Sequence, residues 1–138
     1  MIPKIIHYCW LSNDPMPAEL KRCIKSWKRK LPDYKIKKWD THNFDIYSIP
    51  FVAEACKMRK WAFACDYIRV YALYTEGGIY LDSDVFVRNS LDFCLANRAF
   101  SAGKTHYTLS LIFYTFILHQ YCLFILLIRY LSFIYNII

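Results

Sequence analysis

The sequence predicts an α/β domain built around a mixed sheet, and three observations support this prediction. Short apolar runs of strand-like composition, at residues 3–10 and 34–40, alternate with longer runs of helical periodicity. The longest helical run, residues 60–76, is followed by two glycines and then by a short apolar strand. The 138 residues are 57% hydrophobic and 19% aromatic, which is enough for one packed core and excludes a disordered chain. Alternating elements of this kind are typical of α/β folds.

The N-terminal part begins with residues 3–10 (PKIIHYCW), which we expect to form the first strand, with His7 as a core residue rather than a catalytic one. A helix is predicted over residues 17–31, because apolar side chains recur there at helical spacing: Leu20, Cys23, Ile24, Trp27 and Leu31. One proline suits the first turn of this helix and a second ends it. The alternation in residues 34–40 (YKIKKWD) predicts a second strand.

The rest of the predicted fold lies between residues 51 and 87. A short helix is expected near residues 51–58, and the clearest helix of the chain is expected over residues 60–76. Residues 79–81 (IYL) predict a short buried strand, and residues 85–87 (VFV) predict another. The expected order is therefore strand, helix, strand, two helices and two short strands.

The C-terminal segment differs from the rest of the chain. Residues 108–128 contain no Lys, Arg, Asp or Glu over 21 positions, a length sufficient for a membrane helix. His119 and Gln120 lie in the middle of this run and weaken that interpretation. Three interpretations stay open: a C-terminal membrane anchor, a segment of the core, or an out-of-register end of a truncated chain. We expect residues 105–138 to form a helix that packs against the sheet or enters a membrane.

Positive charge is concentrated near the N-terminus. Residues 1–60 hold 13 Lys or Arg and 6 Asp or Glu, whereas residues 61–138 hold five of each. A basic region suits an anionic partner, namely nucleic acid, an acidic membrane or a phosphorylated substrate, but a solvated helix face explains the cations of residues 21–30 equally well. Nucleic acid is not an expected partner, because no recognised binding motif accompanies these cations.

Cysteine spacing and the first residues of the chain indicate the cellular compartment of the protein. The six cysteines include no pair with C-x-x-C spacing, so neither a zinc ribbon nor a thioredoxin-like site is expected. The apolar run at the N-terminus is too short for a signal peptide. We therefore expect reduced thiols in a cytoplasmic protein. A peripheral position at a membrane, or an anchor in the C-terminal segment, stays open.

Two carboxylates follow the strand at residues 79–81, within the stretch GGIYLDSDV. Because an unpaired buried carboxylate is costly, Asp82 and Asp84 are expected to reach solvent, a cation or a hydrogen-bonding ligand. Ligands of open α/β sheets bind beyond the C-terminal ends of the strands, which is where this pair lies. Two hard oxygen ligands suit Mg²⁺ or Mn²⁺, which takes water and phosphate oxygens as further ligands.

Asp66 and Arg69 stand three residues apart on the mostly apolar helix that precedes this strand. The spacing puts them on one helix face, where they form either an intrahelical ion pair of little energy or a pair that faces the binding cleft. In the second case Arg69 binds a phosphate or sugar, and Asp66 accepts hydrogen bonds from hydroxyl groups.

Three stretches occur in an order and spacing that resemble a known family: IPKIIHYCW, IKSWKRKLPDYKIKKWD and KWAFACDYIRVYALYTEGGIYLDSDV. They resemble the DxD sugar transferases of glycosyltransferase family 32 and, more distantly, the sugar-transferring domain of large clostridial toxins. The likeness covers about residues 2–103, and its D-Y-I-R-x-Y-x-L-Y-x-x-G-G-I-Y-x-D-x-D run is far more specific than D-x-D alone. It implies a GT-A-like, Rossmann-like nucleotide-sugar-binding fold, Mn²⁺ or Mg²⁺ as cofactor, and transfer that retains the anomeric configuration.

The same resemblance implies roles for individual residues. Asp82 and Asp84 match the motif that binds the metal and the diphosphate, and Asp82 is also implied to bind the donor. Asp66 and Arg69 match the pair that holds the donor sugar, and Trp10 matches an aromatic residue beside the nucleotide base. No nucleophile or base stands out, so the catalytic residues stay unassigned. The implied partners are a nucleotide-sugar donor and a glycan or lipid-linked acceptor, in cell-surface polysaccharide synthesis.

The resemblance ends near residue 104. We expect an incomplete GT-A-like donor-binding domain over residues 1–104 and an apolar C-terminal segment over residues 105–138. Lys104 stands where the family commonly has an acidic residue, and the residues after it do not resemble the family's acceptor side. The leading hypothesis is a metal-dependent glycosyltransferase in which sugar transfer is absent or very slow. The alternatives are a non-catalytic remnant that binds nucleotide sugar and a small membrane-associated protein.

Overall fold

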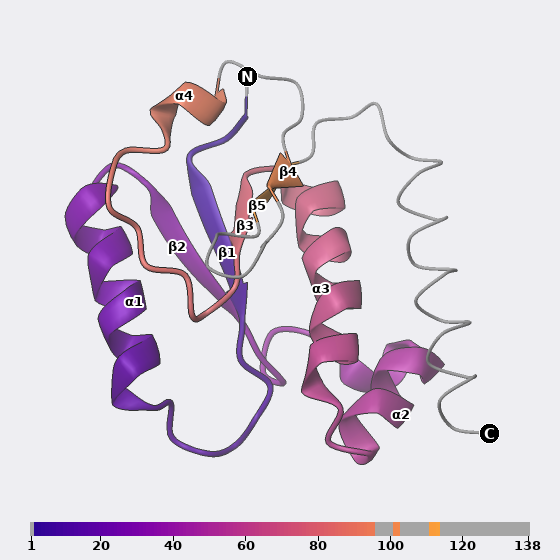
Figure 1. The fold of residues 1–138 in the computed structure, drawn as a ribbon. Coiled ribbons are helices and arrows are strands. Elements are labelled where there is room, and N and C mark those ends of the chain that lie inside the picture. The colour runs from indigo at the N-terminus through magenta and orange to yellow at the C-terminus, as the bar shows by residue number, and fades with distance from the viewer. Residues whose placement is uncertain (1, 96–100, 103–110, 114–138) are drawn as a thin grey trace.

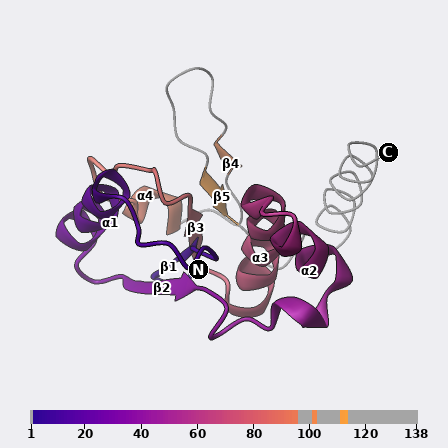
Figure 2. The same cartoon turned by 90° about the horizontal axis from the view of Figure 1, so that it is seen from below.

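The computed structural model describes residues 2–95, 101–102 and 111–113, and a mixed sheet lies at its centre (Figure 1). The strand order in this sheet is β2-β1-β3-β5-β4. Helix α1 covers one face of the sheet, and helices α2 and α3 cover the other (Figures 1 and 2). The predicted α/β class with a mixed sheet is therefore confirmed.

The N-terminal elements follow the predicted order closely: β1 (Ile5–Cys9), α1 (Ala18–Lys30) and β2 (Lys35–Trp39). β1 and β2 pair in parallel, with Ile5 opposite Lys35 and Cys9 opposite Trp39. Two parallel neighbouring strands end at the same edge of a sheet. The residues that follow Cys9 and Trp39 are thus brought together.

The next elements are η1 (Ile46–Ser48), α2 (Pro50–Lys57), α3 (Trp61–Glu76) and β3 (Ile79–Leu81). The short helix and the long helix predicted there are confirmed, as is the buried strand after them. β3 pairs in parallel with β1, so its C-terminal end lies at the same sheet edge as the ends of β1 and β2.

Two glycines allow α3 to pass directly into β3. Gly77 and Gly78 have φ angles of 67° and 89°, in the region that disfavours side chains. A Cβ atom on Gly78 would lie 2.6 Å from the carbonyl oxygen of Ile5, so β1 leaves no space for one. The close approach of this turn to β1 places β3 next to β1, in the middle of the sheet.

Side chains that alternate along the strands divide the core into two halves. On the α1 side, Ile6, Ile79 and Leu81 pack with the fully buried Trp27. On the α2 and α3 side, the strands contribute residues that pack against both helices: Cys9, Trp39 and Tyr80. Each half of the core fixes one helical layer against the sheet.

The strand predicted for residues 85–87 is not formed. The Val85 carbonyl oxygen accepts a hydrogen bond from Trp27 Nε1 at 2.7 Å, and the Val87 N–H donates to Ser26 Oγ at 2.9 Å. These main-chain groups bond to side chains of α1 rather than to another strand. The segment therefore runs along α1 and leads to the short helix α4 (Asp92–Leu95).

Two short strands complete the described part of the sheet. β5 (Leu111–Phe113) pairs antiparallel with β3, and β4 (Ser101–Ala102) pairs antiparallel with β5. The helix expected over residues 105–138 is thus wrong for residues 111–113, which extend the sheet by bonding to β3. The other residues of that segment, and the boundary expected at residue 104, lie outside the described residues. In the part of the chain that is described, no helix is long and apolar enough to cross a bilayer.

Candidate functional site

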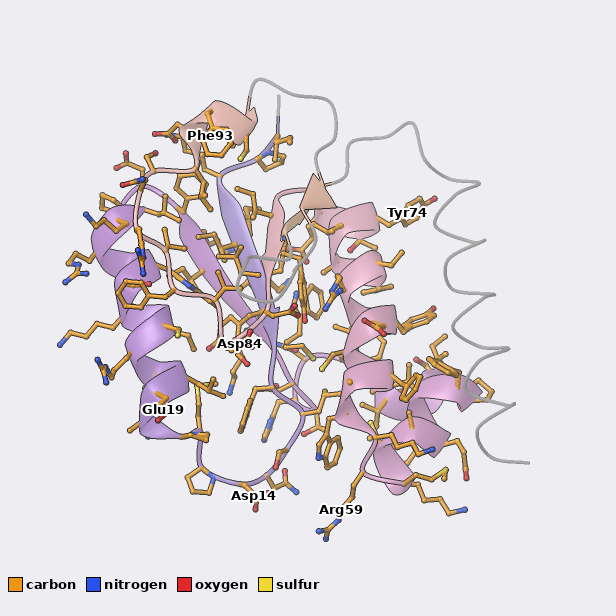
Figure 3. The ribbon with its side chains drawn as sticks, viewed as in Figure 1. Asp14, Glu19, Arg59, Tyr74, Asp84 and Phe93 are labelled. Carbon is orange, nitrogen blue, oxygen red and sulfur yellow. The ribbon has the colours of Figure 1, made fainter. Side chains whose placement is uncertain are left out.

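The two predicted metal ligands lie on a turn at the C-terminal end of β3. The Asp82 carbonyl oxygen accepts a hydrogen bond from the Val85 N–H at 3.0 Å, which closes the turn over residues 82–85. The chain therefore leaves the strand direction at Ser83. Figure 3 shows Asp84 near the lower end of the strands, between α1 and α3.

Asp82 belongs to a half-buried ion-pair cluster with α3. Arg69 Nη2 donates to Asp82 Oδ1 at 2.6 Å, and Arg69 Nη1 lies 3.5 Å from Asp66 Oδ1. The guanidinium group also lies over the ring of Tyr80, 4.8 Å from its centroid, and the Arg69 side chain is only 17% exposed. The intrahelical pair thus exists, and Arg69 also bonds to Asp82 at the end of β3. Contact of Arg69 and Asp66 with a donor stays a prediction.

Burial and charge act against each other in this cluster. Burial raises the pKa of Asp82, and Arg69 acts in the opposite direction. Burial also disfavours the charged form of Arg69, but Asp82, Tyr80 and Asp66 outweigh it and raise the pKa of the guanidinium group. Arg69 therefore stays cationic. Its Nε atom is buried without a hydrogen-bond partner among the described residues, so one donor is unused by the protein.

Asp84 lies in a different environment from Asp82. Its side chain is exposed, and within the described ranges its carboxylate has neither an ion pair nor a hydrogen bond. Its main-chain carbonyl oxygen accepts from the Cys23 thiol of α1 at 3.4 Å. The backbone of Asp84 is thus held by α1, while its carboxylate faces solvent.

The pair of carboxylates fits a hard divalent cation. In the part of the chain that the structure covers, no three His, Cys, Asp or Glu side chains gather closely enough to hold a metal by themselves. Mg²⁺ commonly takes one or two protein carboxylates and completes its shell with water and substrate phosphates, and Mn²⁺ favours the same oxygen ligands. Asp84 is the more accessible ligand, because Arg69 engages an oxygen of Asp82.

A pocket of about 390 Å³ opens at the C-terminal ends of β1 and β2. Its wall includes Tyr8 and Trp10 from the end of β1 and Lys38 and Asp40 from the end of β2. Trp10 Nε1 donates to the Asp14 carbonyl oxygen at 3.1 Å, which ties the indole to the following loop. Since β1, β2 and β3 are parallel neighbours, this pocket lies along the same sheet edge as Asp82 and Asp84. Trp10, predicted to lie beside a nucleotide base, thus lines a pocket near the carboxylates.

Asp40 lies in this pocket wall and was not predicted as a site residue. Its carboxylate lies 2.6 Å from Lys38 Nζ and accepts a hydrogen bond from the His42 N–H at 3.0 Å. Burial acts to raise the pKa of Asp40, but these two partners lower it below its ordinary value. Asp40 follows β2 as Asp82 follows β3, so the same strand-end argument would have found it.

His7 is a buried residue of β1 that bonds to the turn before β3 and does not line the pocket. It is fully buried, Trp39 Nε1 donates to its Nδ1 at 3.1 Å, and its Nε2 lies 2.9 Å from the Gly77 carbonyl oxygen. Because Nδ1 accepts, Nε2 carries the proton and donates to Gly77. Burial lowers the pKa of His7, which favours this neutral tautomer. The prediction of a core histidine is confirmed.

Three thiols pack behind Tyr80 and Arg69: Cys9, Cys56 and Cys65. None of them forms a disulfide. A hydrogen bond with Cys65, together with burial, raises the pKa of Cys9, which keeps its thiol protonated. These thiols pack in the half of the core that lies on the α2 and α3 side.

Comparison with known proteins identifies the family of the chain. A family model described as "Glycosyltransferase sugar-binding region containing DXD motif" matches residues 17–101. An uncharacterized glycosyltransferase of Acanthamoeba polyphaga mimivirus is 31% identical over 111 residues, which are 75% of this chain and 44% of that protein. Inositol phosphoceramide mannosyltransferase 3 of Schizosaccharomyces pombe is 34% identical over 95 residues, which are 66% of this chain and 26% of that protein.

A solved structure shares the fold. The PaToxG glycosyltransferase matches with a TM-score of 0.59 and 19% identity, over 83% of this chain and 55% of that one. This likeness shows a GT-A-like architecture, as predicted. The chain spans less than half the length of the two curated relatives. The matched region contains α1, the Asp66–Arg69 pair and both aspartates, and the chain belongs to the family of glycosyltransferase sugar-binding regions that contain the DXD motif.

Proposed function

We propose that this chain is the donor-binding part of a metal-dependent glycosyltransferase, which moves a sugar from a nucleotide sugar to a hydroxyl group of an acceptor. One observation carries the proposal: Arg69 joins Asp66 to Asp82 beside the exposed carboxylate of Asp84. This cluster shares a sheet edge with a pocket large enough for part of a nucleotide. Membership of the DXD family supports the same function.

The donor is proposed to lie along the strand ends. Trp10 and Tyr8 give the pocket aromatic surface for the nucleobase, while the ion pair of Lys38 with Asp40 adds polar groups to the same wall. The diphosphate then extends from the pocket toward the turn after β3, where Asp84 and Asp82 would hold the cation. The donor sugar lies next to Arg69 and Asp66, which offer one cationic donor and one carboxylate acceptor for its hydroxyl groups.

Transfer breaks the bond between the anomeric carbon of the sugar and the leaving phosphate oxygen. A divalent cation, when bound, supplies a Lewis acid that stabilises the negative charge developing on the diphosphate. Arg69 places a permanent positive charge next to the same turn and keeps Asp82 in a fixed orientation. The catalytic residues stay unassigned, and retention of configuration stays a prediction from the family resemblance.

The acceptor is proposed to be a hydroxyl group on a glycan or on a lipid-linked headgroup. The name of the fission yeast relative describes a mannosyltransferase that acts on inositol phosphoceramide, a lipid whose headgroup carries hydroxyl groups. This likeness favours a lipid-linked acceptor. A place in cell-surface polysaccharide synthesis, and a cytoplasmic or membrane-anchored location, stay predictions.

The test is to incubate the full chain with a panel of nucleotide sugars, with Mn²⁺ or with a chelator, and to measure donor binding and hydrolysis. We expect one donor to bind only with the cation, and the Asp84→Asn variant to lose this binding. Lys57→Gln, which changes an exposed residue of α2, is the matched control and should bind normally. Absence of binding by every donor, or equal binding in the chelator, would contradict the proposal. Transfer to an added acceptor is expected to be slower than about 1 s⁻¹.

A further inference from the structure

The outer face of α1 carries a group of cations that the donor site does not use. We call this group the basic face: Lys21, Arg22, Lys25, Lys28 and Arg29. All five are exposed, and none forms a salt bridge with any described residue. The helix holds one acidic residue, Glu19, near its N-terminal end. In Figure 3, nitrogen-tipped side chains of α1 point away from the sheet.

The cations of the basic face form a stripe along α1 because they recur at helical spacing. Lys21, Lys25 and Lys28 recur at intervals of four and three residues, and Arg22 and Arg29 stand next to them. The opposite side of α1 buries Trp27 and Ser26 against the sheet and the segment at 85–87. A helix of 13 residues is about 20 Å long, so the stripe forms an extended surface rather than a point of charge.

We propose that the basic face is a docking surface for an anionic lipid bilayer. Charge complementarity supports this partner, because clusters of four to eight Lys or Arg attract the anionic lipids of a membrane surface. A flat bilayer can meet an extended stripe of cations along its whole length. A single nucleic-acid strand, by contrast, is bound in a basic groove with several stacking aromatics. The described aromatic pocket lies instead at the strand edge, near Asp82 and Asp84.

Docking through this surface would place the strand edge next to the lipid headgroups. The Cys23 thiol of α1 lies 3.4 Å from the Asp84 carbonyl oxygen, so the helix that meets the bilayer also holds the turn of the carboxylates. A lipid-linked acceptor would then be within reach of the site. The docking itself goes beyond the proposed transferase activity, because it needs neither donor nor turnover. An experiment can therefore contradict one of the two proposals without contradicting the other.

The test is co-sedimentation of the full chain with vesicles made of two parts phosphatidylcholine and one part phosphatidylserine. We expect binding to these vesicles, little binding to pure phosphatidylcholine vesicles, and release by about 0.5 M NaCl. Each Lys near an anionic surface contributes about fivefold in affinity, so Lys25→Gln/Lys28→Gln should weaken binding roughly thirtyfold. Lys57→Gln/Arg59→Gln removes the same charge from α2 and the loop after it, and should change binding by less than about threefold.

Three results would overturn the proposal. Equal weakening by the two double variants would mean that net charge, and not the basic face, attracts the vesicles. Equal binding to both kinds of vesicle would assign the interaction to apolar surface elsewhere in the chain. Tighter binding to duplex DNA or single-stranded RNA than to the anionic vesicles, at the same salt, would make nucleic acid the partner. If Lys25→Gln/Lys28→Gln proves unstable by circular dichroism, Lys21→Gln/Arg29→Gln makes the same comparison.

Discussion

The two carboxylates of the DxD pair are separated by one residue, yet opposite layers of the molecule hold them. Asp82 is engaged from the α3 side, where Arg69 donates to its carboxylate at 2.6 Å. Asp84 is engaged from the α1 side, through its main chain alone, by the Cys23 thiol. One carboxylate is therefore neutralised by the protein, and the other faces solvent with its charge uncompensated by any described side chain.

We therefore expect the two residues of the motif to have different tasks. Asp82 links α3 to the strand end, so we expect it to contribute to the architecture of the site as well as to ligand binding. The Asp84 carboxylate has no ion pair or hydrogen bond with a described residue, so we expect it to contribute little to the fold and to bind the cation. Changes on the α3 side should therefore affect both stability and binding, whereas changes to the Asp84 side chain should affect binding alone.

The largest expected effect on stability comes from removing the cation of the α3 side. Arg69→Ala leaves Asp66 and Asp82 facing one another without Arg69, and loses the contact with Tyr80. A broken buried pair costs roughly 3–5 kcal/mol, and the partial exposure of Asp82 reduces the expected loss to about 2 kcal/mol of unfolding free energy. Urea denaturation of the full chain measures this loss.

The matched control uses an ion pair at the surface. Lys57 Nζ lies 3.7 Å from Glu54 Oε2, with side chains 78% and 48% exposed, and Lys57→Ala should change stability by less than about 0.5 kcal/mol. Asp82→Asn in the Arg69→Ala background should recover part of the loss, since one unpaired charge is removed. An Arg69→Ala variant as stable as the parent would show that the cluster is only a surface ion pair.

A smaller effect is expected from the α1 side. Trp27→Phe removes the hydrogen bond from Nε1 to the buried Val85 carbonyl oxygen and leaves that oxygen without its partner. The expected cost is about 1–2 kcal/mol of unfolding free energy, because an unsatisfied buried acceptor loses its hydration without compensation. The pairing of Arg69 with Asp82 should persist, so Arg69→Ala and Trp27→Phe should be additive within about 0.5 kcal/mol. Strong coupling between them would mean that the two layers are not independent.

The smallest effect concerns His7, which bonds to the Gly77 carbonyl oxygen at the end of α3 and to Trp39 of β2. Burial lowers the pKa of His7 from its ordinary value of 6.5, so the unfolded chain binds this proton more tightly than the folded chain. Its contribution to stability is therefore present above pH 6.5 and is lost as the pH falls below that value. Between pH 7 and pH 6 the loss should be under about 1 kcal/mol. Urea denaturation at several pH values should show a flatter profile for His7→Gln, and parallel profiles would contradict this account.

Much of the fold could be predicted because its signals are local. Apolar periodicity located α1, α2 and α3, and the glycine pair marked the end of α3. The strand predicted at 85–87 failed, since its alternation of buried and exposed residues results from packing along α1 rather than from pairing in the sheet. The place of β5 beside β3 also depends on partners distant in sequence, which periodicity does not reveal.

The site was predicted as a set of residues but not as an arrangement. Motif spacing brought together Asp66, Arg69 and Asp82, and the structure joins them in one cluster. The unequal environments of the two aspartates depend on which layer touches each one, and this information is absent from a local pattern. Asp40 was overlooked for a different reason: it stands alone after β2, without a second carboxylate to draw attention to it.

The most direct test of the different tasks is a calorimetric titration of the full chain with a nucleoside diphosphate and Mn²⁺, made on Asp84→Asn and Asp82→Asn in parallel with urea denaturation. We expect Asp84→Asn to weaken cation-dependent binding on the order of a hundredfold and to change stability by less than about 0.5 kcal/mol. Asp82→Asn should weaken binding and also change stability, because it alters the partner of Arg69. Binding by Asp84→Asn as tight as that of the parent chain, or equal stability effects from both variants, would contradict the division of tasks between the two carboxylates.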